Sequence, residues 1–485
     1  MSKDRMYINN RWTDGSNGEK RPVINPATEE VIAEVADGTK EDAEKAIKAA
    51  HQAFYENGWG DTSARERSEL LLKAAIRLEE RASEIARIET INNGKTLPEA
   101  EGDVADAVNQ LRYYAGIATK PSGQVYDVPE DIQAMVVKEP IGVVAQIVPW
   151  NYPLVMAVQK LAPALAAGCT VVIKPAEQTP LSLIAFFEIL DEIGFPPGVA
   201  NLVLGAGETV GAVLAESPMV DMISFTGGTD TGKFIMRAAA DHIKKVSLEL
   251  GGKSPNIVFE DAEFNSAVDY AMYAIFANQG QVCSAGSRLL LQESIYDKFV
   301  SELVERTKGI KVGSGLDKET EMGPLISQEH MEKVLSYIEI GKREGAELLC
   351  GGTRMFDKGY FVAPAIFTGT TPDMRIVREE IFGPVLVIQT FKDEKEAIRL
   401  ANDSDYGLAG AVFTNDGAKA LRVIKKLRAG ITWINTYHPT FNEAPWGGYK
   451  QSGIGRELGT FGFEEYLETK QININLDVKP SGWYK

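Results

Sequence analysis

A cysteine and a glutamate, each close to glycines, are the two residues of this chain best suited to covalent chemistry. Cys283 lies in Phe276-Ala-Asn-Gln-Gly-Gln-Val-Cys-Ser-Ala-Gly-Ser-Arg288, among small and polar residues instead of the aliphatic ones that usually surround a core cysteine. Glu249 lies at the end of the strand-like run Val246-Ser-Leu-Glu-Leu250, which enters a glycine-rich turn. A thiol nucleophile with a carboxylate base is sufficient to form and hydrolyse a thioester.

A glycine-rich turn between an expected strand and an expected helix is a candidate phosphate site. In Asp221-Met-Ile-Ser-Phe-Thr-Gly-Gly-Thr-Asp-Thr-Gly-Lys233 the turn would direct backbone N–H groups and a helix N-terminus at phosphate. Gly227, Gly232 and Lys233 also satisfy Gly-x4-Gly-Lys, but Phe234 stands where a P-loop needs Ser or Thr. A strict Gly-x-Gly-x-x-Gly is absent. By itself, the turn fits either a dinucleotide site or a tight structural turn.

Two more motifs follow expected strands, at the edge where ligands of doubly wound sheets bind. Glu177 could accept both ribose hydroxyls of NAD while Lys174 donates to the ribose, although a surface ion pair is the alternative. Asn151, within Pro149-Trp-Asn-Tyr-Pro153, could stabilise an oxyanion together with the backbone N–H of Cys283. The alternative for Asn151 is an ordinary turn residue.

The elements that must position these motifs form two series of alternating strands and helices. Helical spacing predicts surface helices at 41–54, 63–92 and 104–118. The first alternating series has strands at 141–148, 170–174, 200–204 and 221–225, with helices at 180–193 and 209–216. The second has strands at 256–259, 288–291, 359–366, 385–390, 410–414 and 430–435, with helices at 294–311 and 328–344. These patterns predict an α/β fold of two doubly wound domains that meet near Gly251.

Composition limits the class of protein further. A chain of 485 residues is too long for one ordinary core, so two or three domains are expected. A net charge of −17 argues against nucleic-acid or membrane-surface binding and favours a cytoplasmic protein that handles uncharged or cationic small molecules. The chain shows neither a signal peptide nor a membrane-spanning stretch. Three cysteines without CxxC pairs and four scattered histidines indicate a reducing compartment and no metal site, and Cys169 and Cys350 are expected to be structural.

The segments around Cys283 and Glu249 resemble those of the aldehyde dehydrogenase superfamily, and the resemblance extends from about Tyr7 to about Ile474. It implies oxidation of aldehydes to carboxylic acids with NAD or NADP, through a thiohemiacetal and a thioester on Cys283. Asn151 would stabilise the oxyanion, and Glu249 would activate the water that hydrolyses the thioester. Glu457 would be a second acid in a proton relay, although a structural ion pair beside Arg456 is the alternative.

The resemblance also implies a division of the chain and an assembly. A Rossmann-like NAD-binding domain would comprise residues 1–120 and 140–250, and a catalytic domain residues 251–450. Residues 121–139 and 463–485 fit neither alternating series and look like strands that extend from the body, with open edges in a monomer. In the resembled family such segments form an oligomerisation domain, so a homodimer or homotetramer is expected.

The cofactor-binding residues implied by the resemblance lie mainly at the ends of the first series of strands. Glu380 would bind the nicotinamide ribose and Phe382 would pack near the nicotinamide. Gly228 replaces the usual serine, which leaves the selectivity for NAD over NADP open. The complete set is Ile147, Val148, Pro149, Trp150, Lys174, Glu177, Gly207, Gly211, Phe225, Thr226, Gly227, Gly228, Thr229, Gly232, Leu250, Glu380 and Phe382.

Three aromatic residues, Tyr152, Phe276 and Trp446, match positions that line the substrate tunnel in the family. Such rings could enclose a trimethylammonium group by cation–π contact, but Gln159 stands where betaine aldehyde dehydrogenases usually carry a tryptophan. A broad range of aldehydes is therefore expected, with betaine aldehyde as the alternative. A CoA-acylating relative commonly lacks the base, so Glu249 argues against that activity. A cysteine hydrolase would need a histidine partner for which no motif is present, and a purely binding role would need the catalytic residues lost.

Overall fold

Five parallel strands form the centre of the first sheet, which has eight strands in the order β2-β1-β9-β8-β7-β10-β11-β21. The computed structural model describes residues 4–129 and 131–484, so residues 1–3, 130 and 485 of the predicted domains lie outside the described residues. The central strands are β7 (Val143–Ile147), β8 (Thr170–Lys174), β9 (Ala200–Leu202), β10 (Met222–Thr226) and β11 (Lys245–Glu249). The strand order reverses at β7, where a ligand crevice is expected beyond the carboxyl ends of the strands.

Both edges of this sheet are closed by antiparallel strands from distant parts of the chain. At one edge, β1 (Met6–Ile8) pairs with β9 and with β2 (Arg11–Thr13). At the other, β21 (Gly453–Ile454) pairs with β11, so that Gly453 lies opposite Glu249. The chain thus returns from the second domain to hold the strand that ends at the candidate base.

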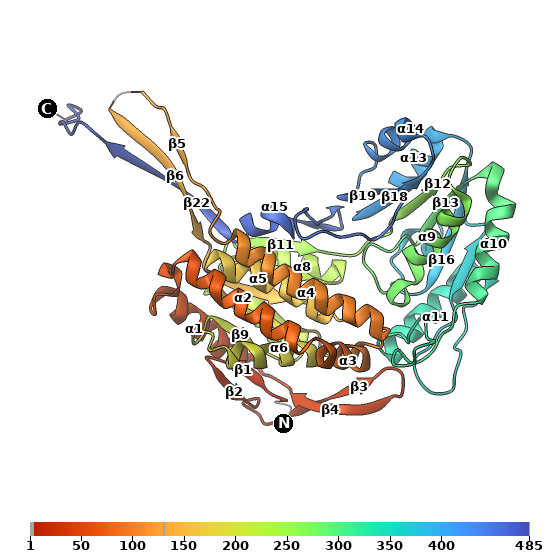
Figure 1. The fold of residues 1–485 in the computed structure, drawn as a ribbon, viewed down its shortest axis with the longest axis horizontal. Coiled ribbons are helices and arrows are strands. Elements are labelled where there is room, and N and C mark those ends of the chain that lie inside the picture. Colours follow the sequence, from red (N-terminus) through yellow and green to blue (C-terminus); the bar gives the residue numbers. More distant parts are fainter. Residues whose placement is uncertain (1–3, 130, 485) are drawn as a thin grey trace.

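Helices cover both faces of the first sheet (Figure 1). Helices α1, α2 and α4 each begin with a capping box, at Thr39, Ser63 and Thr96, which satisfies N–H groups that a helix start leaves free. The helix predicted over 63–92 is wrong as a single element, because non-helical Arg81 divides it. The helices are α1 (Lys40–Tyr55), α2 (Ala64–Glu80), α3 (Ala82–Asn93), α4 (Leu97–Ile117), α5 (Pro153–Ala167), α6 (Leu181–Glu192), α7 (Ala212–Glu216) and α8 (Thr229–Ala240), with a π-helical turn, η2 (Gly207–Gly211), before α7.

The second sheet has seven strands in the order β14-β15-β16-β13-β12-β18-β19, and all but β14 are parallel. Its strands are β12 (Pro255–Val258), β13 (Arg288–Gln292), β14 (Glu347–Cys350), β15 (Ala365–Thr368), β16 (Val385–Phe391), β18 (Ala409–Phe413) and β19 (Ile431–Ile434). The strand predicted over 359–366 is wrong in its first part, since β15 begins at Ala365. Two parallel sheets confirm the predicted α/β class.

The helices of the second domain lie between its strands in the chain and pack on its sheet (Figure 1). They are α9 (Phe264–Phe276), α10 (Tyr296–Lys308), α11 (Gln328–Arg343), α12 (Arg375–Arg378), α13 (Glu394–Asn402) and α14 (Gly417–Ile424). The 3-10 turn η3 (Ala277–Gly280) extends α9 towards Cys283. Outside both sheets, β3 (Lys20–Asn25) pairs with β4 (Glu30–Ala36), and β17 (Tyr406–Gly407) pairs with β20 (Tyr449–Lys450).

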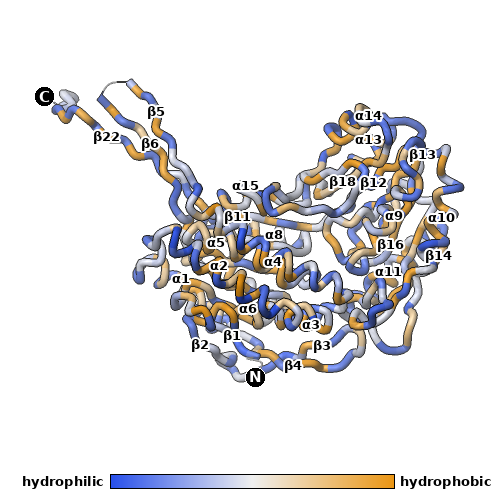
Figure 2. Tube along the Cα trace, viewed as in Figure 1, coloured by the Kyte–Doolittle hydropathy of each residue, from blue (hydrophilic) through white to orange (hydrophobic). Residues whose placement is uncertain are grey.

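A three-stranded antiparallel sheet projects from the body as an arm (Figure 1). It consists of β5 (Gln124–Tyr126), β6 (Ile132–Pro140) and β22 (Leu467–Asn475). The strand of the tail begins at Leu467, because Gly459–Glu464 form the short helix α15. The arm contains both polar and apolar stretches (Figure 2), and β5 and β22 form the two edges of its sheet within the described residues.

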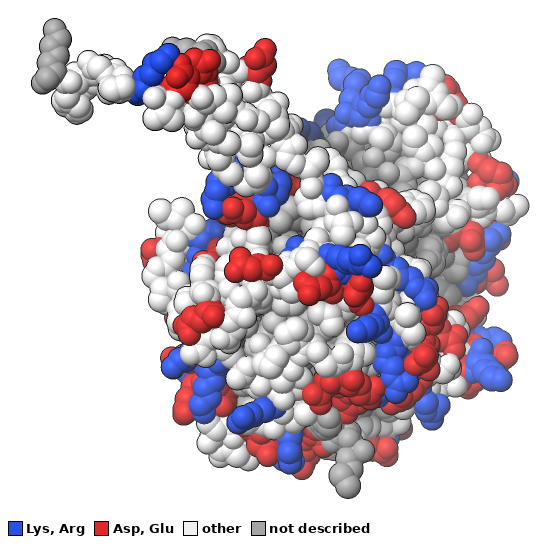
Figure 3. Space-filling view, turned by 60° about the vertical axis from the view of Figure 1, so that its left-hand side comes forward, with Lys and Arg blue, Asp and Glu red and all other residues white. Residues whose placement is uncertain are grey.

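Acidic and basic side chains are interspersed over the face shown in Figure 3, despite the net charge of −17. Among the described residues, no helix combines the length and the apolar character that crossing a membrane requires.

Candidate active site

Cys283 is held at the junction of the two domains by a tight turn. Asn278, Gln279 and Gly280 have φ values of 45°, 60° and 71°, so three consecutive residues are left-handed and the chain reverses just before the cysteine. A Cβ at Gly280 would overlap the carbonyl oxygen of Gly383. The turn therefore requires glycine at this position, and the small residues noted in the sequence serve close backbone packing.

The glycine pair after Glu249 packs directly on the nucleophile segment. A Cβ at Gly252 would overlap the carbonyl oxygen of Cys283, and one at Gly251 would overlap the Glu380 carboxylate. The Gly252 N–H donates to Glu380 Oε1 at 2.9 Å. The end of β11, the cysteine segment and Glu380 are thus brought together around Gly251 and Gly252, and at Gly252 the Cys283 backbone leaves no room for a Cβ.

Glu249 is a buried carboxyl group, 4% exposed, at the carboxyl end of β11. Within the described part of the chain, neither of its oxygens has a hydrogen-bond partner. Burial, followed by the charge of Glu457, raises its pKa well above the ordinary value, and Lys160 and Arg456 offset this only in part. An unpartnered carboxyl group with a raised pKa is suited to accept a proton.

Cys283 is half-buried, and its thiol is a weak acid in the free protein. Burial raises its pKa, as do the charges of Glu249 and Glu380, while backbone N–H groups lower it. At neutral pH the side chain is therefore a thiol, which must lose a proton before it attacks a carbonyl. The charge of Glu249 contributes to this rise, and the packing of Gly252 on the Cys283 carbonyl oxygen brings the two segments together.

Glu457 belongs to a buried polar network behind Glu249. Its carboxylate forms an ion pair with Lys160, which is completely buried, and accepts a hydrogen bond from Gln159 Nε2. Lys160 also donates to Ser224 Oγ at 3.1 Å. An ion pair with Arg456, considered from the sequence, is not formed, because Arg456 donates to backbone carbonyls. The backbone of Glu457 pairs with that of Trp446, which joins this network to the predicted substrate residues.

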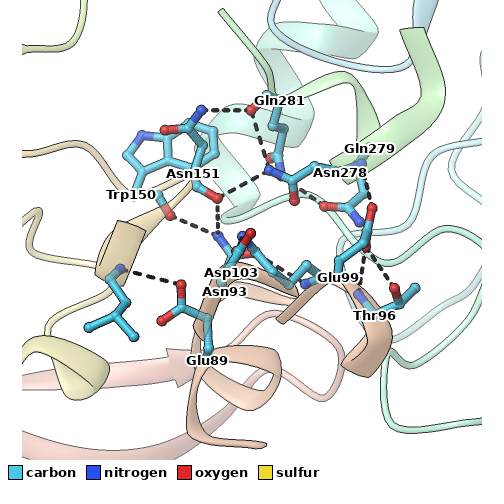
Figure 4. A network of polar contacts seen from close by, with 12 residues as sticks. Glu89, Asn93, Thr96, Glu99, Asp103, Trp150, Asn151, Asn278, Gln279 and Gln281 are labelled. Carbon is cyan, nitrogen blue, oxygen red and sulfur yellow. Dashed lines mark hydrogen bonds and ion pairs between the residues drawn. The ribbon is translucent and has the colours of Figure 1, made fainter. Parts of the chain in front are cut away.

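Asn151 lies between β7 and α5, where its side chain reaches the cysteine segment of the other domain. Its Nδ2 donates to the carbonyl oxygen of Gln281 at 2.9 Å, two residues before Cys283. Its own carbonyl oxygen accepts from Asn278 Nδ2 at 3.1 Å (Figure 4). An amide nitrogen has two N–H groups, so one remains to donate to a ligand beside Cys283.

The predicted ribose-binding pair is assembled at the end of β8. Lys174 Nζ lies 3.2 Å from Glu177 Oε1, which also accepts from the Gly207 N–H at 2.6 Å. Burial raises the pKa of Glu177, but the nearby Lys174 charge and the hydrogen bonds outweigh this and lower it, so the group is a carboxylate at neutral pH. A Cβ at Gly211 would lie 3.8 Å from both Ile147 and Lys174 side chains, which places η2 over the ends of β7 and β8.

The glycine-rich turn after β10 leads into α8, with Gly228 in the N-cap position and Thr229 as the first helical residue. A Cβ at Gly227 would meet the ring of Phe225, whereas one at Gly228 would enter open space. Gly232 packs on the side chain of Leu250. The start of α8 thus presents its free N–H groups at the expected ligand crevice beyond β7 and β10.

Two predicted cofactor residues reach this crevice from the second domain. Burial raises the pKa of Glu380 to about 7. Phe382 adopts a left-handed φ of 62°, and its ring contacts that of Trp150, with centroids 5.2 Å apart. His330 Nε2 bonds to the Phe382 carbonyl oxygen at 2.6 Å, and burial lowers the pKa of His330 to about 4. A neutral imidazole that donates from Nε2 therefore holds this segment in place.

These groups fit a dinucleotide. The helix N-terminus after Gly228 suits a pyrophosphate, and the Glu177 carboxylate suits a ribose diol. The hydroxyl of Thr226 is buried at the same edge without a partner among the described residues. The predicted cofactor residues therefore come from both domains and meet at one edge of the first sheet. Pro149 follows the strand as the sequence predicted, whereas Val148 lies just beyond β7, which ends at Ile147 and not at residue 148.

The three predicted substrate residues pack in one cluster beside the cysteine segment. Tyr152, Phe276 and Trp446 belong to the same apolar core cluster. Trp433 and Tyr437 extend it, with ring centroids of Trp433 and Trp446 6.5 Å apart. Lys95 Nζ lies 4.1 Å from the centroid of the Tyr152 ring.

Several residues of the site did not stand out in the sequence. Tyr437 donates to the Ser284 carbonyl oxygen at 2.9 Å, and Lys160 is the ion-pair partner of Glu457. Asn278 was part of the quoted cysteine motif without a role of its own. A lysine within an otherwise apolar helix, as Lys160 is within α5, is the one signal that could have been followed.

Comparison with known proteins places this geometry in a family. The profile described as "Aldehyde dehydrogenase family" matches residues 12–472. The betaine aldehyde dehydrogenase of Bacillus subtilis is 52% identical over 484 residues, covering 99% of each chain. Aldehyde dehydrogenase 1A1 of Mesocricetus auratus is 47% identical over 480 residues, covering 98% of this chain and 96% of the other. A crystal structure of betaine aldehyde dehydrogenase from Staphylococcus aureus in complex with NAD+ superposes with a TM-score of 0.98 at 50% identity, covering 99% of this chain and 97% of that one.

Proposed function

Because the chain belongs to the aldehyde dehydrogenase family and oxidises aldehydes with NAD, we propose that Cys283, Glu249 and Asn151 carry out this reaction. The observation that carries the proposal is the unpartnered, buried carboxyl group of Glu249 close to the half-buried Cys283. A carboxyl base beside a thiol suits aldehyde oxidation followed by thioester hydrolysis.

The first half of the reaction forms a bond between Cys283 Sγ and the aldehyde carbon. The thiol first loses its proton to solvent, because the raised pKa leaves it protonated at neutral pH. The carbonyl oxygen becomes an oxyanion, which the free N–H of Asn151 Nδ2 and the backbone N–H of Cys283 stabilise. When bound, NAD+ supplies the hydride acceptor that converts the thiohemiacetal into a thioester, and Lys174, Glu177, the α8 N-terminus and Glu380 hold it.

The second half of the reaction hydrolyses the thioester. Glu249 takes a proton from water, and the hydroxide adds to the thioester carbon. The C–S bond then breaks, and Sγ takes up the proton of the departing carboxylic acid, which leaves as a carboxylate. Glu249 must then return its proton to solvent. The Glu457–Lys160 pair behind it is the adjoining polar route, and its charges act on the pKa of Glu249 in opposite directions.

Betaine aldehyde is the substrate that the aromatic cluster and the relatives favour together. The Bacillus subtilis relative is named a betaine aldehyde dehydrogenase. Tyr152 and Trp446 carry aromatic rings of the kind that bind a trimethylammonium cation, and Lys95 Nζ already lies over one face of the Tyr152 ring. Gln159 does not contribute to an aromatic enclosure, since it bonds to Glu457. An aromatic cluster without a ring at Gln159 is consistent with a range of apolar aldehydes beside betaine aldehyde.

The function is tested by NADH absorbance from purified protein, NAD+ and a panel of propanal, benzaldehyde and betaine aldehyde, without CoA. We expect steady turnover with all three and the highest kcat/KM with betaine aldehyde. Turnover that begins only after CoA is added would make the protein an acyl-transferring enzyme and leave Glu249 without a role. Equal kcat/KM for propanal and betaine aldehyde would overturn the substrate assignment alone.

The Glu177 carboxylate is expected to select NAD over NADP. Replacement of Glu177 by Gln should raise the KM for NAD about 10-fold or more, because hydrogen bonds to charged groups contribute about 1.5–3 kcal/mol. The ratio of kcat/KM for NAD to that for NADP should fall, since the charge that repels a 2′-phosphate is lost. Both values come from initial rates at saturating aldehyde. Glu216→Gln, at an exposed site at the end of α7, is the matched control. An unchanged ratio would contradict this role.

The arm is proposed to hold copies of the chain together. Its strands β5 and β22 have free edges, and Val125, Tyr126 and Ile474 expose apolar side chains on it. A homodimer or homotetramer would cover both the strand edges and these apolar side chains. Sedimentation of the full chain decides between the two assemblies. With its acidic charge and its reduced cysteines, the protein is proposed to act in the cytoplasm.

A further inference from the structure

The proposed oxyanion donors come from opposite sides of the domain junction. Asn151 lies in the first domain, after β7, and the backbone N–H of Cys283 lies in the second, after η3. Two donors can stabilise one oxygen only if they converge on the same point to within a fraction of an ångström. Some contact must therefore fix the distance between the two segments.

Asn278 makes that contact from the second domain. Its side-chain Nδ2 donates to the Asn151 carbonyl oxygen at 3.1 Å and lies 3.4 Å from the carbonyl oxygen of Gln281. The Gln281 oxygen also accepts from Asn151 Nδ2 at 2.9 Å. One amide group thus joins the backbone that carries Asn151 to the backbone that carries Cys283 (Figure 4).

Asn278 is itself fixed by a group of the first domain. Its N–H donates to Glu99 Oε1 at 2.8 Å, while Glu99 Oε2 accepts from both the N–H and the hydroxyl of Thr96 at the start of α4. The side chain is 2% exposed, so its bonds are made away from competing water. Its φ of 45° is left-handed, a conformation that asparagine adopts more readily than most residues.

We propose that Asn278 is a positioning residue that sets the oxyanion-binding geometry by clamping Asn151 to the segment of Cys283. The inference rests on the proposed function, because it takes Asn151 as an oxyanion donor. Asn278 touches no reacting atom and acts through Asn151. Loss of its side chain therefore slows the steps that develop the oxyanion and leaves NAD binding unchanged.

The test compares Asn278→Gly and Asn278→Asp, each alone and combined with Asn151→Ala. Glycine keeps the left-handed backbone and removes the clamp, whereas aspartate keeps the shape and turns a carboxylate towards two carbonyl oxygens. The readouts are the single-turnover rate of NADH formation, with enzyme in excess over aldehyde, and the Kd for NAD. We expect each single variant to slow NADH formation about 100-fold, as a misplacement of about 1 Å does, with an unchanged Kd.

In the Asn151→Ala background, the same substitutions at Asn278 should slow the reaction less than about 2-fold, because the group through which they act is gone. An equal slowing in both backgrounds, or a wild-type rate for Asn278→Gly, would overturn the inference while leaving the proposed function intact. A wild-type rate for Asn151→Ala alone would instead remove the premise. If the Asn278 variants do not fold, Glu99→Gln, with one acceptor oxygen in place of two, should slow the same step about 10-fold, and no effect would count against the clamp.

Discussion

Replacement of Cys283 by alanine is expected to lower kcat for NADH formation by about 10⁴-fold or more for every aldehyde. Removal of a catalytic nucleophile typically has an effect of this size, because no other group can form the covalent intermediate. The cofactor residues are untouched, so the Kd for NAD should stay within about 2-fold. Initial rates and a fluorescence titration with NAD measure the two quantities.

Cys350→Ala is the matched control, since Cys350 is also half-buried but ends β14, away from the junction. It should keep the parent activity. Because burial and two carboxylates raise the pKa of Cys283, alkylation of this thiol should be slow at neutral pH and accelerate as the pH rises. Substantial turnover by Cys283→Ala, or equal loss in both cysteine variants, would be incompatible with Cys283 as the nucleophile.

The sequence could predict those parts of the molecule that follow from local patterns. Short β-branched runs predicted β7, β8 and β10, and the glycine pair after β10 predicted a turn at its carboxyl end. Glycine is required where two backbones pack too closely to leave room for a Cβ. Gly252 and Gly280 are such positions, and they marked the segment around Cys283 in the sequence. The carboxyl ends of parallel strands lie at one edge of a sheet. The sequence could therefore assign Asn151, Glu177 and Glu249 to the same edge.

Contacts between distant segments could not be predicted in this way. Strand β21 has only two residues, and its pairing with β11 is decided by the return of the chain from the second domain. Lys160 and Glu457 are separated by 297 residues, and neither shows its partner in its local sequence. The break at Arg81 within 63–92 was missed because the apolar spacing of α2 and α3 is nearly continuous across it.

Replacement of Glu249 by Gln is expected to leave one rapid turnover and to lower steady-state kcat about 10²- to 10⁴-fold, the usual contribution of a general base. The amide cannot take a proton from water, so the thioester accumulates. Rapid mixing of enzyme, NAD+ and aldehyde should show a burst of NADH equal to the active sites. A variant such as Glu260→Gln, at an exposed position after β12, should show the parent rate.

The pH dependence of the parent enzyme tests the same role. Because burial and the Glu457 charge raise the pKa of Glu249 above its ordinary 4.5, the basic carboxylate is scarce at low pH and its fraction rises with pH up to that raised pKa. Where hydrolysis limits turnover, log kcat should therefore rise with a slope of about one over this window. This rise of log kcat with pH should be absent in Glu249→Gln, because the amide does not titrate.

The stability of the folded parent should change with pH in the opposite sense to kcat. Folded Glu249 retains a proton that the unfolded chain releases above pH 4.5, so this residue destabilises the folded state increasingly as the pH rises towards its raised pKa. Glu249→Gln removes that dependence and should unfold at a temperature at least as high as the parent at neutral pH. If Glu249→Gln loses hydrolysis but unfolds at no lower temperature than the parent, its defect lies in the reaction and not in the stability of the fold. A parent-like kcat and pH profile in Glu249→Gln would show that another group activates the water.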